Sequence, residues 1–148
     1  MQIFTDGSKV DEKVAAAAVL SVAPNSPFSC QLRDHCSIYT AELQAVLFAR
    51  KQACQSQDRK FMIFSDSLST LQALWKSESD YPLLIQIQEL LHKINTDQTE
   101  ILFMWVPKHV GIQGNQATDG AAKEALDNKP TADLMPFSDL KPLTAKYV

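Results

Sequence analysis

One apolar segment, VAAAAVLSVA at residues 14–23, decides the fold class of this chain. A run with almost no polar position predicts a strand buried on both faces, since a strand with one wet face would alternate. A shorter strand is expected before it, at residues 2–6, and a third strand at residues 28–33, after a proline-bounded turn. Three strands joined by short turns predict an antiparallel meander.

After residue 33 the apolar residues change to helical spacing, interrupted by two short strands. The expected helices cover residues 40–54, 68–75, 82–94 and about 115–126, and the expected strands cover residues 61–65 and 101–106. This order predicts an α/β fold with a mixed five-stranded sheet, three antiparallel strands followed by parallel strands, flanked by helices. We expect one domain over residues 1–128 and, at residues 129–148, a C-terminal extension or connector to a neighbouring domain.

Composition narrows the class of protein. With 45% hydrophobic and 21% charged residues, the 148-residue chain suits one globular domain. Its longest apolar run, residues 14–20, is far shorter than the roughly 20 residues of a membrane span, and the N-terminus lacks the basic and apolar regions of a signal peptide. We therefore expect no membrane association, an intracellular location in cytoplasm or nucleus, and a monomer.

Cysteine spacing and net charge argue against two common kinds of site. Cys30, Cys36 and Cys54 form no C-x-x-C pattern, so we expect buried thiols in a reducing compartment rather than a zinc site. Fourteen basic and 17 acidic residues give a net charge of -3. Such a balance lacks the strongly basic character that is usual in nucleic-acid-binding domains.

Four acidic residues stand at positions where a purely structural role explains them poorly. Asp6 and Asp66 are each expected at the end of an apolar strand. Glu42 opens an otherwise apolar helix, and Asp119 is expected in the first turn of the last helix, after a glycine-rich loop. Singly, each acid suits a helix cap or the positive end of a helix. Together they can converge at one edge of the sheet, where like charges need a cation, and oxygen ligands favour Mg²⁺ or Mn²⁺ over zinc.

Four motifs have an order and spacing that resemble those of type 1 ribonuclease H, over roughly residues 2–127. They are Thr5-Asp6-Gly7-Ser8, Thr40-Ala41-Glu42, Ser65-Asp66-Ser67 and the segment from His109 to Asp119. Three further stretches are similar to the ribonuclease H domain of non-LTR retrotransposon polyproteins, namely residues 37–43, 105–112 and 137–142. In those polyproteins the domain follows a reverse transcriptase on the same chain.

The resemblance implies a ribonuclease H-like fold and an endonuclease that hydrolyses the RNA strand of RNA–DNA hybrids. The family pattern implies two Mg²⁺ ions about 4 Å apart, with Mn²⁺ as a substitute. Their ligands would be Asp6, Glu42, Asp66 and Asp119, and Asp6 would bridge both ions. His109, on its glycine-flanked loop, would transfer protons or assist product release.

The resemblance also implies where the hybrid binds. Substrate contacts are expected from Gly7, Ser8, Ser37, Tyr39 and Thr40, with Ser37 at a phosphate of the DNA strand. Two divalent ions would bring the formal charge balance from -3 to about +1, which permits a hybrid substrate but leaves few basic residues for its phosphates. A reverse transcriptase domain on the same parent chain is therefore the expected partner.

Two positions depart from the family pattern. Gln116 stands where glutamate is usual, and Gly120 follows Asp119 inside the last helix, at a cost of about 0.5–1 kcal/mol. Two alternatives to an active hybrid nuclease remain open. One is a catalytically weak or inactive module that docks hybrid beside a polymerase. The other is a nuclease of the same fold with a different substrate, such as an integrase or a junction resolvase.

Overall fold

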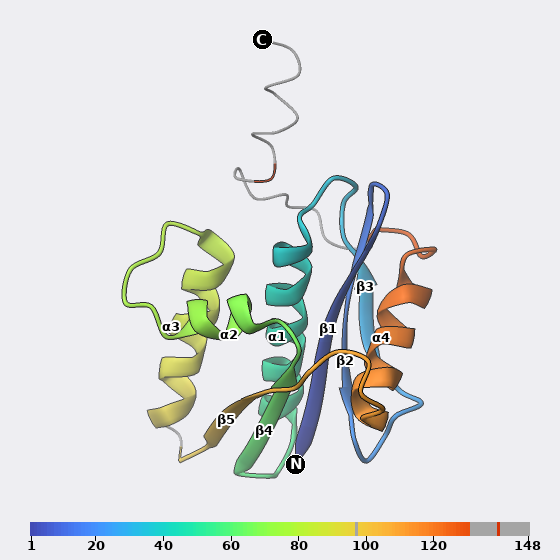
Figure 1. The fold of residues 1–148 in the computed structure, drawn as a ribbon. Coiled ribbons are helices and arrows are strands. Elements are labelled where there is room, and N and C mark those ends of the chain that lie inside the picture. Colours follow the sequence, from blue (N-terminus) through green and yellow to red (C-terminus); the bar gives the residue numbers. More distant parts are fainter. Residues whose placement is uncertain (97, 131–138, 140–148) are drawn as a thin grey trace.

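Five strands form a single mixed sheet in the order β3-β2-β1-β4-β5 (Figure 1). The computed structural model describes residues 1–96, 98–130 and 139. The strands and helices are β1 (Gln2–Val10), β2 (Lys13–Leu20), β3 (Phe28–Gln31), α1 (Ile38–Gln55), β4 (Lys60–Ser65), α2 (Leu68–Leu74), α3 (Pro82–Thr96), β5 (Glu100–Trp105) and α4 (Gln113–Ala125). Strands β1 to β3 are antiparallel, whereas β4 and β5 run parallel to β1. The predicted order of elements and the mixed α/β sheet are confirmed.

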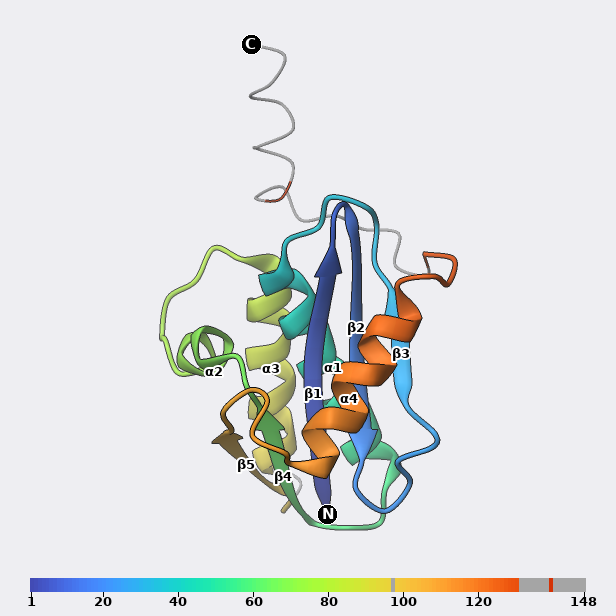
Figure 2. The same cartoon turned by 45° about the vertical axis from the view of Figure 1, so that its right-hand side comes forward.

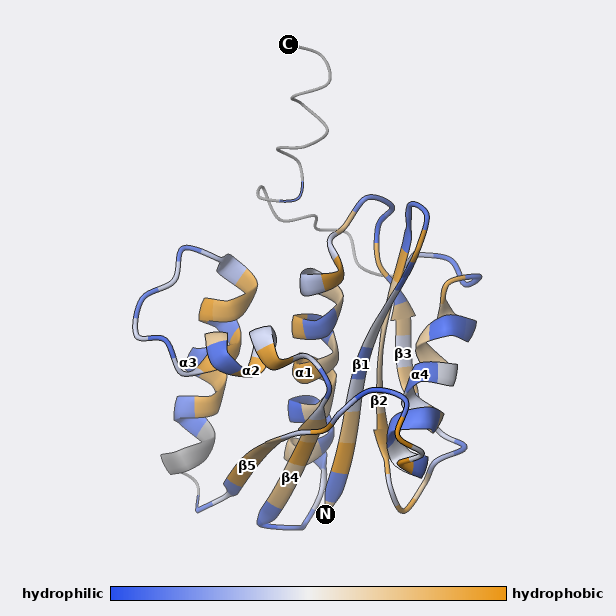
Figure 3. Ribbon diagram, viewed as in Figure 1, coloured by the Kyte–Doolittle hydropathy of each residue, from blue (hydrophilic) through white to orange (hydrophobic). Residues whose placement is uncertain are grey.

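Strand β2 is buried because helices cover the sheet from both sides (Figure 2). Successive side chains of a strand point to opposite faces. Val14 and Ala16 pack with residues of α1, whereas Ala17 and Val19 pack with residues of α4. Figure 3 shows that α4 is largely hydrophilic on the side that faces away from the sheet. The apolar run that predicted a doubly buried strand is thereby explained.

A second apolar cluster joins the helices on the α1 side of the sheet. Leu43 and Val46 of α1 pack with Leu84 and Ile87 of α3, and α2 adds further leucines to the same cluster. The apolar stripe predicted for α3 therefore faces α1. Its last predicted member, Ile94, has a side chain that lies outside the described residues.

The position of Asp6 within its strand differs from the prediction. Strand β1 does not end at Asp6 but continues to Val10, because its second half stays paired with β2. On its other side β1 pairs with β4 only from Gln2 to Thr5. Asp6 therefore lies in the middle of a strand, one residue beyond the point where the parallel ladder with β4 ends.

The last helix begins earlier than predicted. Helix α4 starts at Gln113 rather than at about residue 115, so Asp119 lies in its second turn and not in its first. Gly114 belongs to this first turn instead of to a loop. A Cβ atom on Gly114 would come within 2.2 Å of the Phe4 ring, so the missing side chain lets α4 lie directly against β1.

The structure also bears on the cysteines, on membrane-spanning helices and on the C-terminal segment. Cys30 and Cys36 are buried as expected, whereas Cys54 is exposed on α1. No described helix is both long and apolar enough to cross a bilayer. Of the C-terminal segment expected at residues 129–148, only residues 129, 130 and 139 belong to the described part, so most of the motif at residues 137–142 lies outside it.

Candidate active site

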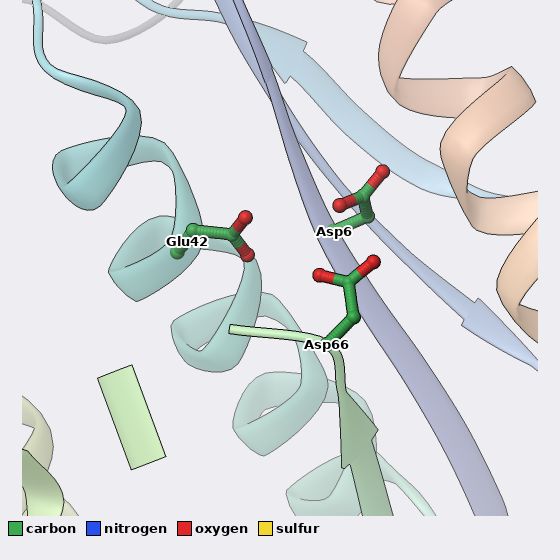
Figure 4. A group of neighbouring side chains, drawn as sticks. All are labelled: Asp6, Glu42 and Asp66. Carbon is green, nitrogen blue, oxygen red and sulfur yellow. The ribbon is translucent and has the colours of Figure 1, made fainter. Parts of the chain in front are cut away.

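Three carboxylates meet where β1, α1 and the end of β4 come together (Figure 4). Asp6 projects from β1, Asp66 directly follows β4, and Glu42 lies in the second turn of α1. One oxygen of each carboxylate lies within 4.8 Å of the oxygens of the other two. Asp6 is 2% exposed and Glu42 is 4% exposed, so both acids are nearly shielded from bulk water. The structure thus brings together three of the four acids that the sequence singled out.

A close approach of α1 to β1 brings Glu42 to the strand. A Cβ atom added to Gly7 would lie 2.9 Å from the Cβ of Ala41 and 2.9 Å from the backbone nitrogen of Glu42. Contacts this short exclude any side chain at position 7. Since β4 has already ended beside Asp6, the Glu42 carboxylate reaches the strand without meeting a neighbouring strand.

We expect Gly7→Ala to destabilise the protein by about 1–3 kcal/mol, because the added methyl group would push α1 away from β1. Urea unfolding measures this change. Gly120→Ala is the matched control, since a Cβ at Gly120 in helix α4 meets no atom within 4 Å. That control should raise stability by up to about 1 kcal/mol, as alanine replaces glycine in a helix. Equal stability of Gly7→Ala and the unaltered protein would contradict the packing argument.

Burial and mutual repulsion disfavour the charged form of these acids. Burial, and then the charge of Asp66, raises the pKa of Asp6 to about 7. Burial, and then the charges of Asp6 and Asp66, raises the pKa of Glu42 to about 8. The Lys108 ammonium acts on both pKa values in the opposite direction. Asp6 and Glu42 are therefore fully ionised at neutral pH only with more positive charge beside them than Lys108 supplies.

Three neighbouring side chains surround Asp66. The indole Nε1–H of Trp105 donates to the Asp66 backbone carbonyl at 3.2 Å, and Asn115 Nδ2 donates to Asp66 Oδ2 at 3.5 Å. The Lys108 ammonium lies 3.5 Å from Asp66 Oδ1 and 3.9 Å from Asp6 Oδ1. Sequence reasoning assigned no role to Lys108 or Asn115. The available signal was their place in the motif, because Lys108 directly precedes the candidate histidine and Asn115 directly follows Gly114.

Asp119 lies at the same cleft but outside the compact group of three acids. Its carboxylate pairs with Lys123 at 2.6 Å, and its side chain is one-third exposed. Its charge still contributes to raising the pKa of Asp6. Asp66 and Asp119 both line a cleft of about 400 Å³. Asp119 therefore lies at the edge of the site. It is in the second turn of α4, and its carboxylate is paired with Lys123 of the same helix.

His109 lines this cleft from the loop between β5 and α4. Its backbone φ is 59°, a left-handed conformation that few residues other than glycine adopt. Gly111, two residues on, has a φ of 84°. The loop therefore turns sharply beside the acids and holds the imidazole at the mouth of the site.

The five residues expected to contact substrate fall into two groups. Gly7 and Ser8 line the cleft together with the acids. Ser37 is the N-cap of α1, and its hydroxyl accepts a hydrogen bond from the Thr40 backbone N–H at 3.1 Å. Tyr39 packs edge-on against Tyr81. The second group thus lies at the start of α1, outside the cleft lining.

A carboxylate from the C-terminal segment binds this start of α1. Asp139 Oδ2 accepts hydrogen bonds from the Ser37 backbone N–H at 2.9 Å and from the Thr40 hydroxyl at 2.5 Å. The Thr40 hydroxyl also bonds the Tyr81 hydroxyl. Asp139 and Thr40 are both buried. Sequence reasoning did not find this contact, because no local spacing relates residues 99 positions apart.

We expect Asp139→Ala to lower the free energy of unfolding by about 1–2 kcal/mol, because the N-terminus of α1 loses its anionic partner and two donors, of which the Thr40 hydroxyl is buried, lose an acceptor. Thermal and urea unfolding of the full chain measure the loss. Asp127→Ala is a suitable control, since Asp127 is largely exposed and pairs only with Lys13 among the described residues. Similar stabilities of the two variants would refute a capping role.

The residues present fit a hard divalent cation. Asp6 Oδ1, Glu42 Oε2 and Asp66 Oδ1 are buried and have no hydrogen-bond partner. Buried acceptors without a partner are costly, and a cation placed among them would satisfy all three. Carboxylate oxygens are the ligands that Mg²⁺ and Mn²⁺ prefer.

Comparison with known proteins agrees with this geometry. The family model described as RNase H matches residues 1–127. This range contains the named elements β1 to β5 and α1 to α4 of the described residues, together with the three clustered acids. Comparison with curated proteins finds no match.

Proposed function

Because the chain belongs to the RNase H family, we propose that it is an endonuclease that hydrolyses the RNA strand of RNA–DNA hybrids. The observation that supports this most directly is the buried group formed by Asp6, Glu42 and Asp66, in which one oxygen of each carboxylate lacks a hydrogen-bond partner. The same cleft also carries positive charges that suit a polyanionic substrate, from Lys9, Lys108 and Lys123.

The proposed cofactor is Mg²⁺, at two ions per site, with Mn²⁺ as a substitute. Asp6, Glu42 and Asp66 would hold the ions, and Asp119 would join them after parting from Lys123. When bound, such ions supply a nucleophilic water at neutral pH and neutralise charge on the phosphate and on the leaving 3′-oxygen.

The chain itself contributes positioning and proton transfer. Attack of water on phosphorus breaks the bond to the 3′-oxygen and leaves a 5′-phosphate and a 3′-hydroxyl. The water loses a proton in this reaction, and the leaving oxygen gains one. His109 lines the cleft from a sharply turned loop, so its imidazole would carry a proton in one of these transfers or assist release of the product.

The proposed substrate contacts divide between the cleft and the start of α1. Gly7 and Ser8 line the cleft and would lie beside the RNA strand. Ser37, Tyr39 and Thr40 would lie beside the hybrid at the start of α1, with Ser37 at a phosphate of the DNA strand. A phosphate bound there would have to share or replace the hydrogen bonds that Asp139 now accepts.

Incubation of the full chain with a labelled RNA–DNA hybrid tests the proposed activity. We expect cleavage of the RNA strand with Mg²⁺ or Mn²⁺ and none with EDTA, while duplex DNA and single-stranded RNA stay intact. Binding of hybrid without turnover, at high protein concentration and low salt, would instead indicate an inactive docking module. Cleavage of duplex DNA with the hybrid left intact would indicate a different nuclease of the same fold.

We further propose that the parent protein is a non-LTR retrotransposon polyprotein that carries a reverse transcriptase. Three stretches of sequence support this, at residues 37–43, 105–112 and 137–142. The small number of basic residues also favours a second domain that holds the hybrid. Sequencing the gene upstream of the Met1 codon tests the idea, which fails if no reverse transcriptase is encoded there.

A further inference from the structure

The ammonium group of Lys108 reaches the acidic group from the loop between β5 and α4. Its Nζ lies 3.5 Å from Asp66 Oδ1 and 3.9 Å from Asp6 Oδ1. These are two of the three buried carboxylate oxygens that have no hydrogen-bond partner. Both acidic side chains are 3% exposed, whereas the Lys108 side chain is 49% exposed. A partly solvated lysine thus directs its charge at a buried pair of acids.

This ammonium and a divalent ion would compete for the same oxygens. Mg²⁺ binds carboxylate oxygens at about 2.0–2.1 Å and requires a nearly regular octahedral arrangement of ligands. The acidic oxygens lie within 4.8 Å of one another, so the space among them is small. An ammonium held at 3.5–3.9 Å from two of these oxygens would repel an ion bound to them. Binding of the ion therefore requires Lys108 to withdraw.

The charges around Lys108 favour its presence when no metal is bound. The Lys108 ammonium lies within ion-pair distance of Asp6 Oδ1 and Asp66 Oδ1, and the Glu42 carboxylate belongs to the same group of acids. Its positive charge offsets the mutual repulsion of these clustered carboxylates. The lysine therefore supplies part of the positive charge that the three acids need.

The Lys108 side chain can move away from the acids toward solvent. Half of its side chain already faces solvent, and it lines the cleft together with the adjacent His109. Lys108 directly precedes His109 in a sharply turned loop, so a movement of its ammonium takes place beside the imidazole.

We propose that Lys108 is an internal counter-ion that occupies the cation position of the Asp6–Glu42–Asp66 group and must be displaced by divalent metal. The inference rests on the proposed metal site. It adds that this chain lowers its own metal affinity with a residue outside the ligand set. The displaced ammonium then faces the cleft, where the phosphates of a hybrid would attract it.

Metal titration without substrate tests the proposal in the full chain. Mn²⁺ binding is measured by calorimetry and by the electron paramagnetic resonance of free Mn²⁺ for the unaltered protein, Lys108→Met and Lys9→Met. Lys9 is a matched control because it lines the same cleft, but its ammonium donates to the Cys36 carbonyl at 2.9 Å instead of pairing with an acid.

We expect Lys108→Met to bind Mn²⁺ about tenfold more tightly than the unaltered protein, and Lys9→Met to change the affinity by less than about twofold. In EDTA, Lys108→Met should melt at a lower temperature than Lys9→Met, since the acids have lost their counter-ion. Tighter metal binding combined with lower metal-free stability is a pair of changes that a purely structural lysine would not produce.

Two results would overturn the proposal in different ways. Unchanged or weaker Mn²⁺ affinity in Lys108→Met would overturn the counter-ion role. If Asp66→Asn then loses Mn²⁺ binding, the proposed metal site itself still stands. Absence of Mn²⁺ binding in every protein would overturn both. Lys108→Gln repeats the test if the methionine variant does not fold, because glutamine also removes the charge and is readily solvated.

Discussion

Asp66→Asn should reduce hydrolysis of an RNA–DNA hybrid by about a thousandfold or more while the protein stays folded. Asparagine keeps the shape of the side chain but removes the negative charge that a cation requires. Asp66 directly follows β4, and Trp105 and Asn115 hold it in place, so little rearrangement is expected. The metal-free variant should be at least as stable as the unaltered protein, because one of three repelling carboxylates is gone.

Initial rates on a labelled hybrid with Mg²⁺ measure the first effect, and thermal unfolding in EDTA measures the second. Asp127→Asn is the matched control. It makes the same chemical change at an exposed residue that lies outside the cleft lining. Full activity of Asp66→Asn would remove the basis for the proposed reaction, whatever the stability of the variant.

Stability of the metal-free protein should fall as the pH rises from about 4 to about 8. Burial raises the pKa of Asp6 from 3.8 to about 7 and that of Glu42 from 4.5 to about 8. Between these values the folded protein retains protons that the unfolded chain has released. The free energy of unfolding therefore decreases with increasing pH. The stabilising contribution is complete below the unfolded pKa values and is lost as the pH passes the folded ones.

Urea unfolding in EDTA at pH 5 and pH 8 measures this dependence. The doubly substituted Asp6→Asn, Glu42→Gln protein is the reference, since it lacks both titrating groups. We expect the stability of the unaltered protein, relative to this reference, to be lower at pH 8 than at pH 5 by at least about 2 kcal/mol. Mg²⁺ should restore stability at pH 8 and have little effect at pH 5, because ligands must lose their protons before they bind metal. A constant difference between the two proteins across this pH range would contradict the shifted pKa values.

The sequence predicted the sheet and the clustering of three acids because both depend on local patterns. An uninterrupted apolar run at residues 14–20 requires burial on both faces, and α1 and α4 provide it. Asp66 was correctly expected at the end of a strand. The place of Asp6 was wrong, because the end of its strand is set by pairing with β2 and not by its own apolar residues.

Other features of the site could not be predicted, because they depend on contacts between distant segments. Lysine in a polar loop is ordinarily solvated, so nothing local distinguishes Lys108 from its neighbours. Only the fold places its ammonium beside Asp6 and Asp66. Asp119 was expected to converge with the other three acids, but it lines the cleft outside their group and pairs with Lys123 within α4.

The hydrogen bonds of Asp139 have a consequence for how a recombinant fragment should be delimited. The RNase H match ends at residue 127, before the carboxylate that binds Ser37 and Thr40. A fragment trimmed to that match would keep the described strands and helices and the three clustered acids, and the Ser37 hydroxyl would still cap α1. The Ser37 backbone N–H and the Thr40 hydroxyl would lose the Asp139 carboxylate. We therefore expect the start of α1 to be held less firmly in the trimmed fragment, so that stability and activity are best assayed on the full chain.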